Sequence, residues 1–128
     1  MKYYIKATTN GEVKVMGMLG ERFSLDEMKN FVGGLVERVS MQGNSICMFV
    51  DEEGFLKGKP INMAATKIIR SWQESKGIPP EWRVSAIVGD AVICSAAFGG
   101  MNVNNLNKVL ALIGRKFKEE GEGNEIVQ

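Results

Sequence analysis

The segment Asn30–Asn62, NFVGGLVERVSMQGNSICMFVDEEGFLKGKPIN, sets strong turn signals only a few residues apart. A glycine pair leads into one short apolar run, and a second run ends in the acidic turn Asp51–Gly54. Short runs rich in Val, Ile and Phe, bounded by Gly, Asn and Asp, are typical of strands. We therefore predict that most of this segment builds the scaffold of a sheet.

The same segment predicts two hairpins. Residues 34–41 form one predicted strand and residues 45–58 a second one that turns back on itself, with residues 42–44 as the turn between them. The acidic turn would close its hairpin onto Phe55 and Leu56. Three acidic residues together could also bind a metal, but the spacing of an EF-hand loop is missing, so a solvated turn is the better interpretation.

Residues 24–34 predict the first of three helices. Ser24 and Glu27 have the spacing of a capping box, in which each side chain accepts a hydrogen bond from the other residue's backbone. Gly33 or Gly34 would supply the left-handed residue that ends the helix.

The other two helices are longer. Residues 59–77 have Pro60 near the start, an apolar stripe at helical spacing, and Gly77 at the end. Residues 99–121 predict a glycine-led helix with apolar side chains on one side. These side chains are Val103, Leu106, Val109, Leu110, Ile113 and Phe117.

Further strands are predicted at both ends of the domain. Asn10 and Gly11 form the pair best suited to a type I′ hairpin turn, with alternating apolar residues on either side. Residues 83–98 are the most apolar and β-branched stretch, which predicts the central strand or strands. Gly89 and Asp90 mark a bulge or a tight turn within it.

These patterns predict an α+β fold, a twisted and mostly antiparallel sheet with about three packed helices. The chain of 128 residues is long enough for a single core. We expect one domain over residues 1–120 and a flexible C-terminal tail over residues 121–128.

The net charge and the lack of histidine limit the classes of function that the chain can have. The formal net charge is +1 and there is no histidine. A near-neutral chain lacks the basic face that nucleic-acid binding needs, and without histidine the commonest general base and metal ligand are missing. We predict no enzyme activity, cofactor or metal. The acid/base candidates that remain are Glu37, Asp51, Glu52, Glu53 and Asp90, and no pattern places two of them together.

The chain is expected to be cytoplasmic and to have no membrane partner. No apolar run approaches the roughly 20 residues of a membrane span, and the N-terminus lacks the long apolar region of a signal peptide. Cys47 and Cys94 both lie in apolar, β-like stretches, so buried and reduced thiols are expected. A disulfide stays open if the two strands are neighbours.

The segment FGGMNVNN is the strongest candidate for a ligand site. A glycine pair precedes a helix whose first turn is rich in asparagine, and helix N-termini present free amides to phosphate groups. The aromatic residue before the glycines could stack on a base. The candidate binding residues are Phe98, Gly99, Gly100, Asn102 and Asn104, with Arg115 further along the helix. The structural alternative is a glycine loop in which Asn102 caps the helix.

A second candidate is the set of arginine and tryptophan residues Arg70, Trp72, Trp82 and Arg83. Both residue types are preferred where flat charged ligands or partner proteins are held. Trp72 falls on the apolar stripe of its helix, which predicts core packing. Trp82 lies in a loop, where core packing explains it less well. Trp82 and Arg83 are therefore candidate residues of a ligand site or a subunit interface.

The strings GGLVERV, MFVDEEGFLKGKPIN and AIVGDAVI occur in an order that resembles a family of small, uncharacterised phage and prophage proteins. The family pattern has Gly-Gly before an Ile-Glu-Val-like strand, an Asn/Asp-Glu-Glu-Gly turn, a Leu-Gly-x-Pro-x-Asn segment and a Val-Gly-Asp strand. The resemblance runs from about Phe23 to Ser95. The departures are Asp51, where asparagine is commoner, and the long helical segment between Asn62 and Trp82. The matching residues are Gly33, Gly34, Glu37, Asp51, Glu52, Glu53, Gly54, Gly58, Pro60, Asn62, Gly89 and Asp90.

The resemblance implies a phage-borne protein. In size and layout the chain is also similar to the anti-Thoeris (Tad-type) sponges, phage proteins that sequester cyclic ADP-ribose isomers made by bacterial TIR-domain defence enzymes, without cleaving them. A sponge needs no turnover, which suits a chain without a general base. We therefore expect an anti-defence homo-oligomer that binds a cyclic nucleotide, with Arg115 of one subunit near the Phe98 loop of another.

Two alternatives stay open. A protein-interaction module that inhibits a host defence or replication protein would use an exposed face such as Trp82 and Arg83. A carboxylate-dependent enzyme would form product, and product formation would stop on mutation of Asp90 or Glu52.

Overall fold

The computed structural model describes residues 1–41, 45–120 and 123–127, and its centre is one five-stranded sheet. The strands are β1 (Tyr3–Ala7), β2 (Val13–Gly17), β3 (Val36–Met41), β4 (Ile46–Asp51) and β5 (Ala91–Ser95). Their order is β2-β1-β5-β4-β3, and every neighbouring pair is antiparallel. β5 is therefore the central strand, as the sequence predicts for this region.

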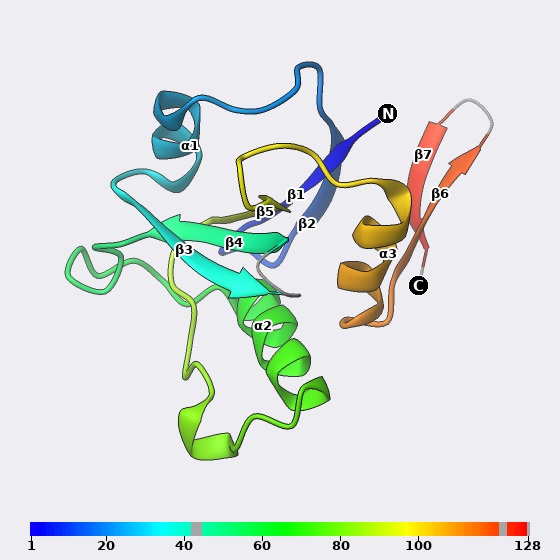
Figure 1. The fold of residues 1–128 in the computed structure, drawn as a ribbon. Coiled ribbons are helices and arrows are strands. Elements are labelled where there is room, and N and C mark those ends of the chain that lie inside the picture. Colours follow the sequence, from blue (N-terminus) through cyan, green and yellow to red (C-terminus); the bar gives the residue numbers. More distant parts are fainter. Residues whose placement is uncertain (42–44, 121–122, 128) are drawn as a thin grey trace.

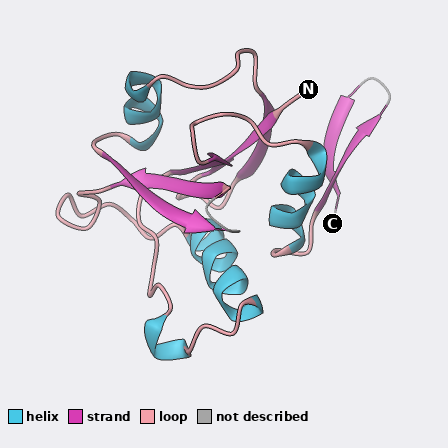
Figure 2. Cartoon of the chain, in the orientation of Figure 1, coloured by secondary structure: helices cyan, strands magenta, loops and turns pink. Residues whose placement is uncertain are grey.

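Three helices accompany the sheet (Figure 1 and Figure 2), which confirms the predicted α+β class. They are α1 (Leu25–Val32), α2 (Met63–Ser75) and α3 (Val103–Ala111). The remaining elements are a 3-10 helix (Pro80–Trp82) and a separate two-stranded ribbon of β6 (Lys116–Glu120) and β7 (Gly123–Val127).

The sheet is covered on both faces, because neighbouring residues of a strand point to opposite sides. On β5, Ile93 packs with residues of α2 and α3, whereas Val92 packs with residues of α1. Figure 1 shows α1 and α2 on opposite sides of the sheet. The central strands β4 and β5 are buried almost throughout, so they read as continuous apolar runs in the sequence.

The first helix begins and ends where its sequence predicts. The hydroxyl of Ser24 accepts a hydrogen bond from the Glu27 N–H at 3.1 Å, and the Glu27 carboxylate accepts one from the Ser24 N–H at 3.0 Å. Gly33 ends α1 with a φ of +82°, in the left-handed region that favours glycine. The predicted capping box and glycine stop are both confirmed.

The first hairpin is confirmed, but the predicted turn type is wrong. Thr8 and Glu12 close the loop, and Gly11 donates to the Thr8 carbonyl oxygen at 3.1 Å. A type I′ turn needs positive φ at both central residues, yet here Gly11 has a φ of +89° and Asn10 does not share it. The loop is therefore a three-residue turn that ends in a left-handed glycine.

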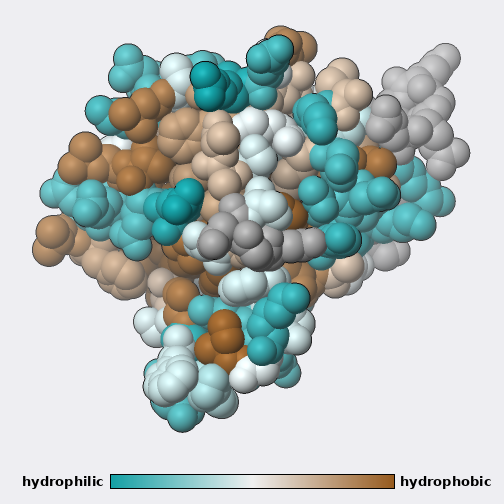
Figure 3. All heavy atoms as spheres, viewed as in Figure 1, coloured by the Kyte–Doolittle hydropathy of each residue, from teal (hydrophilic) through white to brown (hydrophobic). Residues whose placement is uncertain are grey.

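The predicted hairpin from the acidic turn onto Phe55 and Leu56 is wrong. Residues 52–58 form consecutive turns, with Phe55 69% and Leu56 87% exposed. Figure 3 shows hydrophobic residues at the surface on the left of the view, the side on which Figure 1 places this loop. The β3–β4 hairpin is confirmed, and its predicted turn residues 42–44 lie outside the described residues.

The third helix is shorter than predicted. It ends at Ala111, and Gly114 with a φ of +70° turns the chain into β6. Phe117 belongs to this strand instead of the helix, yet its ring is buried 4.8 Å from the ring of Tyr3. Apolar residues after Leu110 thus continue the core by a change of direction rather than along the helix.

The stretch predicted as a C-terminal tail contains a strand, and the predicted bounds of the domain and its tail stay a prediction. Residues 123–127 pair with β6 as β7. Residues 121, 122 and 128 lie outside the described residues.

Candidate functional site

The loop with the predicted nucleotide-binding glycines is built into the scaffold. Phe98 has a φ of +64°, and its ring lies 5.0 Å from that of Phe49 in the core beneath α1. Gly99 and Gly100 lie so close to neighbouring chain that a Cβ on Gly100 would clash with Lys2. The glycines permit a close backbone approach, which agrees with the structural alternative.

The asparagines and the arginine of the same candidate lie at opposite ends of α3. Asn102 caps the helix, accepting a hydrogen bond from the Asn105 N–H at 2.8 Å, and Asn104 is exposed. Arg115 follows the end of this nine-residue helix, about 13 Å away at 1.5 Å per residue. Within one chain the structure does not bring Arg115 together with the Phe98 loop.

Trp82 and Arg83 lie in a third place, the loop beyond the C-terminal end of α2 (Figure 1). Trp82 is 76% exposed, and the Arg83 Nε donates to the Ile78 carbonyl oxygen at 2.8 Å, which fixes this loop. Trp72, by contrast, packs against the larger core, as its helical position predicts.

The acidic turn holds a buried ion-pair cluster in place of the solvated turn that was predicted. The Asp51 side chain is completely buried, with its carboxylate 2.8 Å from Lys57 Nζ and 2.7 Å from Lys59 Nζ. The Glu53 N–H also donates to this carboxylate at 2.9 Å. Burial alone would raise the pKa of Asp51, but these hydrogen bonds and the nearby cations hold it well below its usual value.

The two lysines connect this cluster to α1. Lys57 donates to the Gly33 carbonyl oxygen at 3.1 Å and Lys59 to that of Val32 at 2.8 Å. Carbonyl groups at a helix end lack partners within the helix, so these ammonium groups satisfy them. The Asp-Glu-Glu-Gly turn therefore fastens α1 to the sheet and leaves Asp51 unavailable as an acid or base.

Asn62 has a similar structural role at the start of α2. Its amide donates to the carbonyl oxygens of Ala7 at 2.8 Å and Gly89 at 2.9 Å, and its Oδ1 accepts from the Ala65 N–H at 3.0 Å. The residue is fully buried. Much of the sequence pattern around the acidic turn thus joins scaffold elements.

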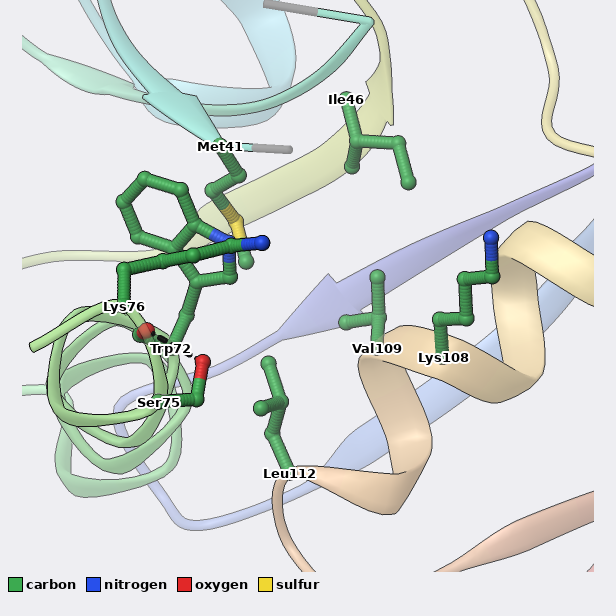
Figure 4. Close-up of a pocket in the computed structure, with 8 residues that line it drawn as sticks. All are labelled: Met41, Ile46, Trp72, Ser75, Lys76, Lys108, Val109 and Leu112. Atoms are coloured by element: carbon green, nitrogen blue, oxygen red, sulfur yellow. Dashed lines mark hydrogen bonds between the residues drawn. The ribbon is translucent and has the colours of Figure 1, made fainter. Parts of the chain in front are cut away.

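A pocket of about 250 Å³ lies between α2, α3 and the ends of β3 and β4 (Figure 4). Apolar side chains from both strands and from α3 line it, and Trp72 comes from α2. Two lysines, Lys76 and Lys108, stand on opposite sides of it. The lining residues are Met41, Ile46, Trp72, Ser75, Lys76, Lys108, Val109 and Leu112.

The polar groups of this pocket are suited to an anion. Lys76 and Lys108 are exposed, and neither forms an ion pair with the side chains that the structure describes. The indole Nε1 of Trp72 is buried and has no hydrogen-bond partner among the described residues. Figure 4 shows the indole beside the side chains of Lys76 and Met41. A buried donor without a partner costs about 1–3 kcal/mol, so an acceptor that reached it would be bound favourably.

Sequence reasoning missed this pocket. Lys76 and Lys108 are thirty-two positions apart and look like ordinary solvated residues at the ends of amphipathic helices. The pocket exists because α2 and α3 lie on the same face of the sheet without closing over it, and no local pattern encodes the space between two helices.

The two cysteines are direct neighbours across β4 and β5. Cys47 pairs with Cys94 in the register of the sheet, and both are reduced thiols with no solvent exposure. Burial, and to a smaller extent the neighbouring Cys47, raises the pKa of Cys94 to about 12. The pair behaves as part of the core.

Across residues 1–41, 45–120 and 123–127, no three acidic, cysteine or histidine side chains gather as a metal site would require. In the same residues, no helix has the length and apolar character needed to cross a membrane.

The fold and the pocket define a small α+β protein with one sheet covered on both faces and a lysine-flanked hollow between two helices. The chain belongs to the family described as Domain of unknown function (DUF3846), whose model matches residues 5–118. No curated protein and no solved structure matches the chain.

Proposed function

We propose that this protein is a non-enzymatic binding protein that sequesters a cyclic nucleotide immune signal, a cyclic ADP-ribose isomer of the Thoeris type, for a phage. The observation that carries the proposal is the pocket between α2 and α3. There two lysines without an ion-pair partner among the described side chains flank a tryptophan whose indole donor has no hydrogen-bond partner in the same residues. The phage origin rests on the sequence resemblance alone.

The pocket chemistry matches the parts of such a ligand. Pyrophosphate oxygens would contact Lys76 and Lys108, and the base would lie against Trp72 and the apolar floor of the pocket. Lys76 is exposed, so its side chain can swing toward a phosphate. The indole N–H would then donate to an acceptor on the ligand.

The size of the pocket supports a shared site. About 250 Å³ is below the roughly 300–1,000 Å³ that encloses a drug-sized molecule. One pocket would hold part of a cyclic nucleotide, and a second copy of the chain would cover the rest. This keeps the expected homo-oligomer within the proposal.

Sequestration without turnover is consistent with the chemical groups of the chain. Histidine is absent, and Asp51, the one buried carboxylate among the described side chains, is neutralised by two lysines. Tight binding needs only complementary charge and stacking, whereas hydrolysis needs a positioned base.

The test is a thermal shift of the purified protein against cyclic ADP-ribose isomers and cyclic dinucleotides. A ligand present at a hundred times its Kd adds about 2.7 kcal/mol of stability. In a chain of this size that raises the melting temperature by roughly 10 °C. Native mass spectrometry on the same samples gives the oligomeric state, and the ligand recovered after heat denaturation should be intact.

Charge reversal locates the site. Lys76→Glu and Lys108→Glu should each weaken binding about tenfold or more, because each places a carboxylate beside the phosphates. Lys67→Glu, an exposed lysine of α2 outside this pocket, is the matched control. Cleaved product, or equal binding by all three variants, would contradict the proposal.

The exposure of Trp82 favours a second candidate, a protein-interaction module that inhibits a host protein. An aromatic side chain that is 76% exposed next to an arginine is typical of interface centres. If no nucleotide shifts the melting temperature, a host protein that copurifies with the wild type and is lost with Trp82→Ala would support this candidate.

A further inference from the structure

A groove separate from the lysine pocket lies along the first turns of α2. Its volume is about 640 Å³, and it runs between the start of the helix and the extended segment before Gly89. Its apolar walls include Ile61 and Met63, which are 52% and 70% exposed. The lining residues are Gly11, Ile61, Met63, Ala64, Thr66, Lys67, Arg70, Ser85 and Ala86. Exposed apolar side chains around one hollow are typical of an interaction surface.

The extended segment beside this groove is clamped at both ends. On one side of it, Val84 donates to Gln73 Oε1 at 3.0 Å and its carbonyl oxygen accepts from Arg70 at 2.8 Å. On the other side, the Ile87 N–H donates to Thr66 Oγ1 at 2.8 Å. These bonds fix the segment against α2.

Between the two clamps, the backbone groups of Ser85 and Ala86 have no hydrogen-bond partner among the described residues. Ser85 is exposed and Ala86 partly exposed. A fixed, extended stretch with free N–H and C=O groups is a template for pairing with another extended chain.

The groove also carries positive charge. Lys67 and Arg70 lie three residues apart on one face of α2 and are both exposed. No carboxylate lines the groove, and neither cation forms an ion pair with a described side chain. An acidic group on an incoming chain would therefore meet two unneutralised cations.

We infer that this groove binds an extended, acidic and apolar segment of a partner protein. The segment hydrogen-bonds to free backbone groups between the two clamps, places an apolar side chain between Ile61 and Met63, and sets a carboxylate near Lys67 and Arg70. The inference goes beyond the ligand-binding proposal and does not depend on it, because the two sites share no lining residue.

A peptide is favoured over an anionic membrane surface by the backbone groups. Cations beside exposed apolar residues also suit lipid headgroups, but a lipid surface makes no use of a clamped pair of peptide groups. The two possibilities give different results in the experiment below.

The experiment selects random twelve-residue displayed peptides on the immobilised full-length protein and measures a selected peptide by fluorescence anisotropy. Selected sequences should alternate apolar and polar residues and contain at least one Asp or Glu. Ala86→Pro should weaken binding about tenfold, because it removes a backbone donor that has no partner within the chain. Lys67→Glu should weaken it by about the same factor.

Lys76→Glu is the control, since this lysine belongs to the other pocket, and its binding should stay within about twofold of wild type. Met63→Glu, at an exposed position of the groove, provides a second disruption if the proline variant fails to fold. The inference is overturned if no peptide family is enriched, if Lys67→Glu and Met63→Glu bind as wild type, or if the protein binds phosphatidylglycerol vesicles in place of peptides.

Discussion

Asp51 secures the end of α1 through two lysines. Its carboxylate holds Lys57 and Lys59 in place, and their ammonium groups donate to the carbonyl oxygens of Gly33 and Val32. An ion pair with a buried carboxylate adds little by forming but is costly to break on one side, because Lys57 and Lys59, whose side chains are 39% and 23% exposed, would lose their shared partner.

We predict that Asp51→Asn lowers the free energy of unfolding by about 3 kcal/mol, since two ammonium groups would then face a neutral amide. Urea unfolding monitored by circular dichroism measures the change. Glu52→Gln, an exposed neighbour in the same turn, should stay within about 0.5 kcal/mol of wild type. Equal losses in both variants would show that the turn, and not the buried pair, matters.

The same carboxylate makes the folding stability depend on pH, and the lowered pKa fixes the direction of that dependence. The pKa of Asp51 is lowered in the folded protein, so the unfolded chain takes up its proton first as the pH falls. The contribution of Asp51 is therefore complete above about pH 4, the ordinary pKa of aspartate, and declines below it. The stability difference between wild type and Asp51→Asn should shrink by about 1 kcal/mol between pH 7 and pH 3, whereas an unchanged difference would contradict this.

Single-residue features were predictable where the partners are close in sequence. Ser24 and Glu27 are three residues apart, and the capping box formed as predicted. The role of Asp51 was not predictable from sequence. It depends on two lysines of the following loop contacting the carboxylate and on the end of α1 lying next to them. A run of acidic residues beside a glycine is the same sequence pattern whether the turn is solvated or holds a buried ion pair.

At the scale of elements, one side chain at the junction between α3 and β6 makes the two backbone hydrogen bonds that a neighbouring strand would make. The Asn107 amide donates to the Phe117 carbonyl oxygen at 3.2 Å and its Oδ1 accepts from the Phe117 N–H at 2.7 Å. Both backbone groups of Phe117 are thus bonded as they would be in a sheet. An isolated two-stranded ribbon is marginal in water, so this anchor and the buried Phe117 ring hold β6 and β7 to the domain.

We predict that Asn107→Ala lowers the free energy of unfolding by about 2 kcal/mol and speeds hydrogen exchange at the Phe117 amide, because two bonds to a half-buried strand are lost. Asn107→Asp keeps the acceptor for the Phe117 N–H and should show an intermediate loss. Asn104→Ala, an exposed asparagine on the same helix, is the control. An equal loss in Asn104→Ala would contradict the anchor, because alanine has the higher helix propensity and the control variant should not lose stability.

This junction also shows why element boundaries were predicted less well than element types. Ile113 and Phe117 continue the helical spacing of α3, so the sequence favours a longer helix. Gly114 stops the helix by adopting a positive φ, so Ile113 reaches the core from the turn before it and Phe117 from β6. Periodicity identifies which side chains are buried but not the path that takes them there.

At the scale of the whole molecule, two helices on one face and one on the other bury the middle of the sheet completely. Cys47 and Cys94 lie opposite each other in that middle layer with no solvent exposure. The sequence predicted buried thiols correctly but left their pairing open. The strand order, which makes them neighbours, follows from contacts between distant parts of the chain. The candidate ligand pocket was missed for the same reason.

We predict that neither cysteine reacts with a thiol reagent at pH 8 while the protein is folded. Both sulfur atoms are buried, and burial raises the pKa of Cys94 to about 12, so the reactive thiolate is scarce. Absorbance of the released reagent group should rise only as urea unfolds the chain. Ser85→Cys, at an exposed position, should react at once and serves as the positive control. Rapid labelling of the native wild type would contradict the burial of the pair.

The strand order β2-β1-β5-β4-β3 determines at which point of synthesis the five-stranded sheet can be completed. The hairpins β1–β2 and β3–β4 are local and can form as soon as their residues leave the ribosome. Among the described residues they share no strand pairing with each other, and β5, residues Ala91–Ser95, is the strand that joins them. Until that stretch emerges, both hairpins carry an unpaired inner edge. The nascent chain is then most exposed to chaperones and proteases, and a stop codon before Ala91 would leave two half-sheets with nothing to join them.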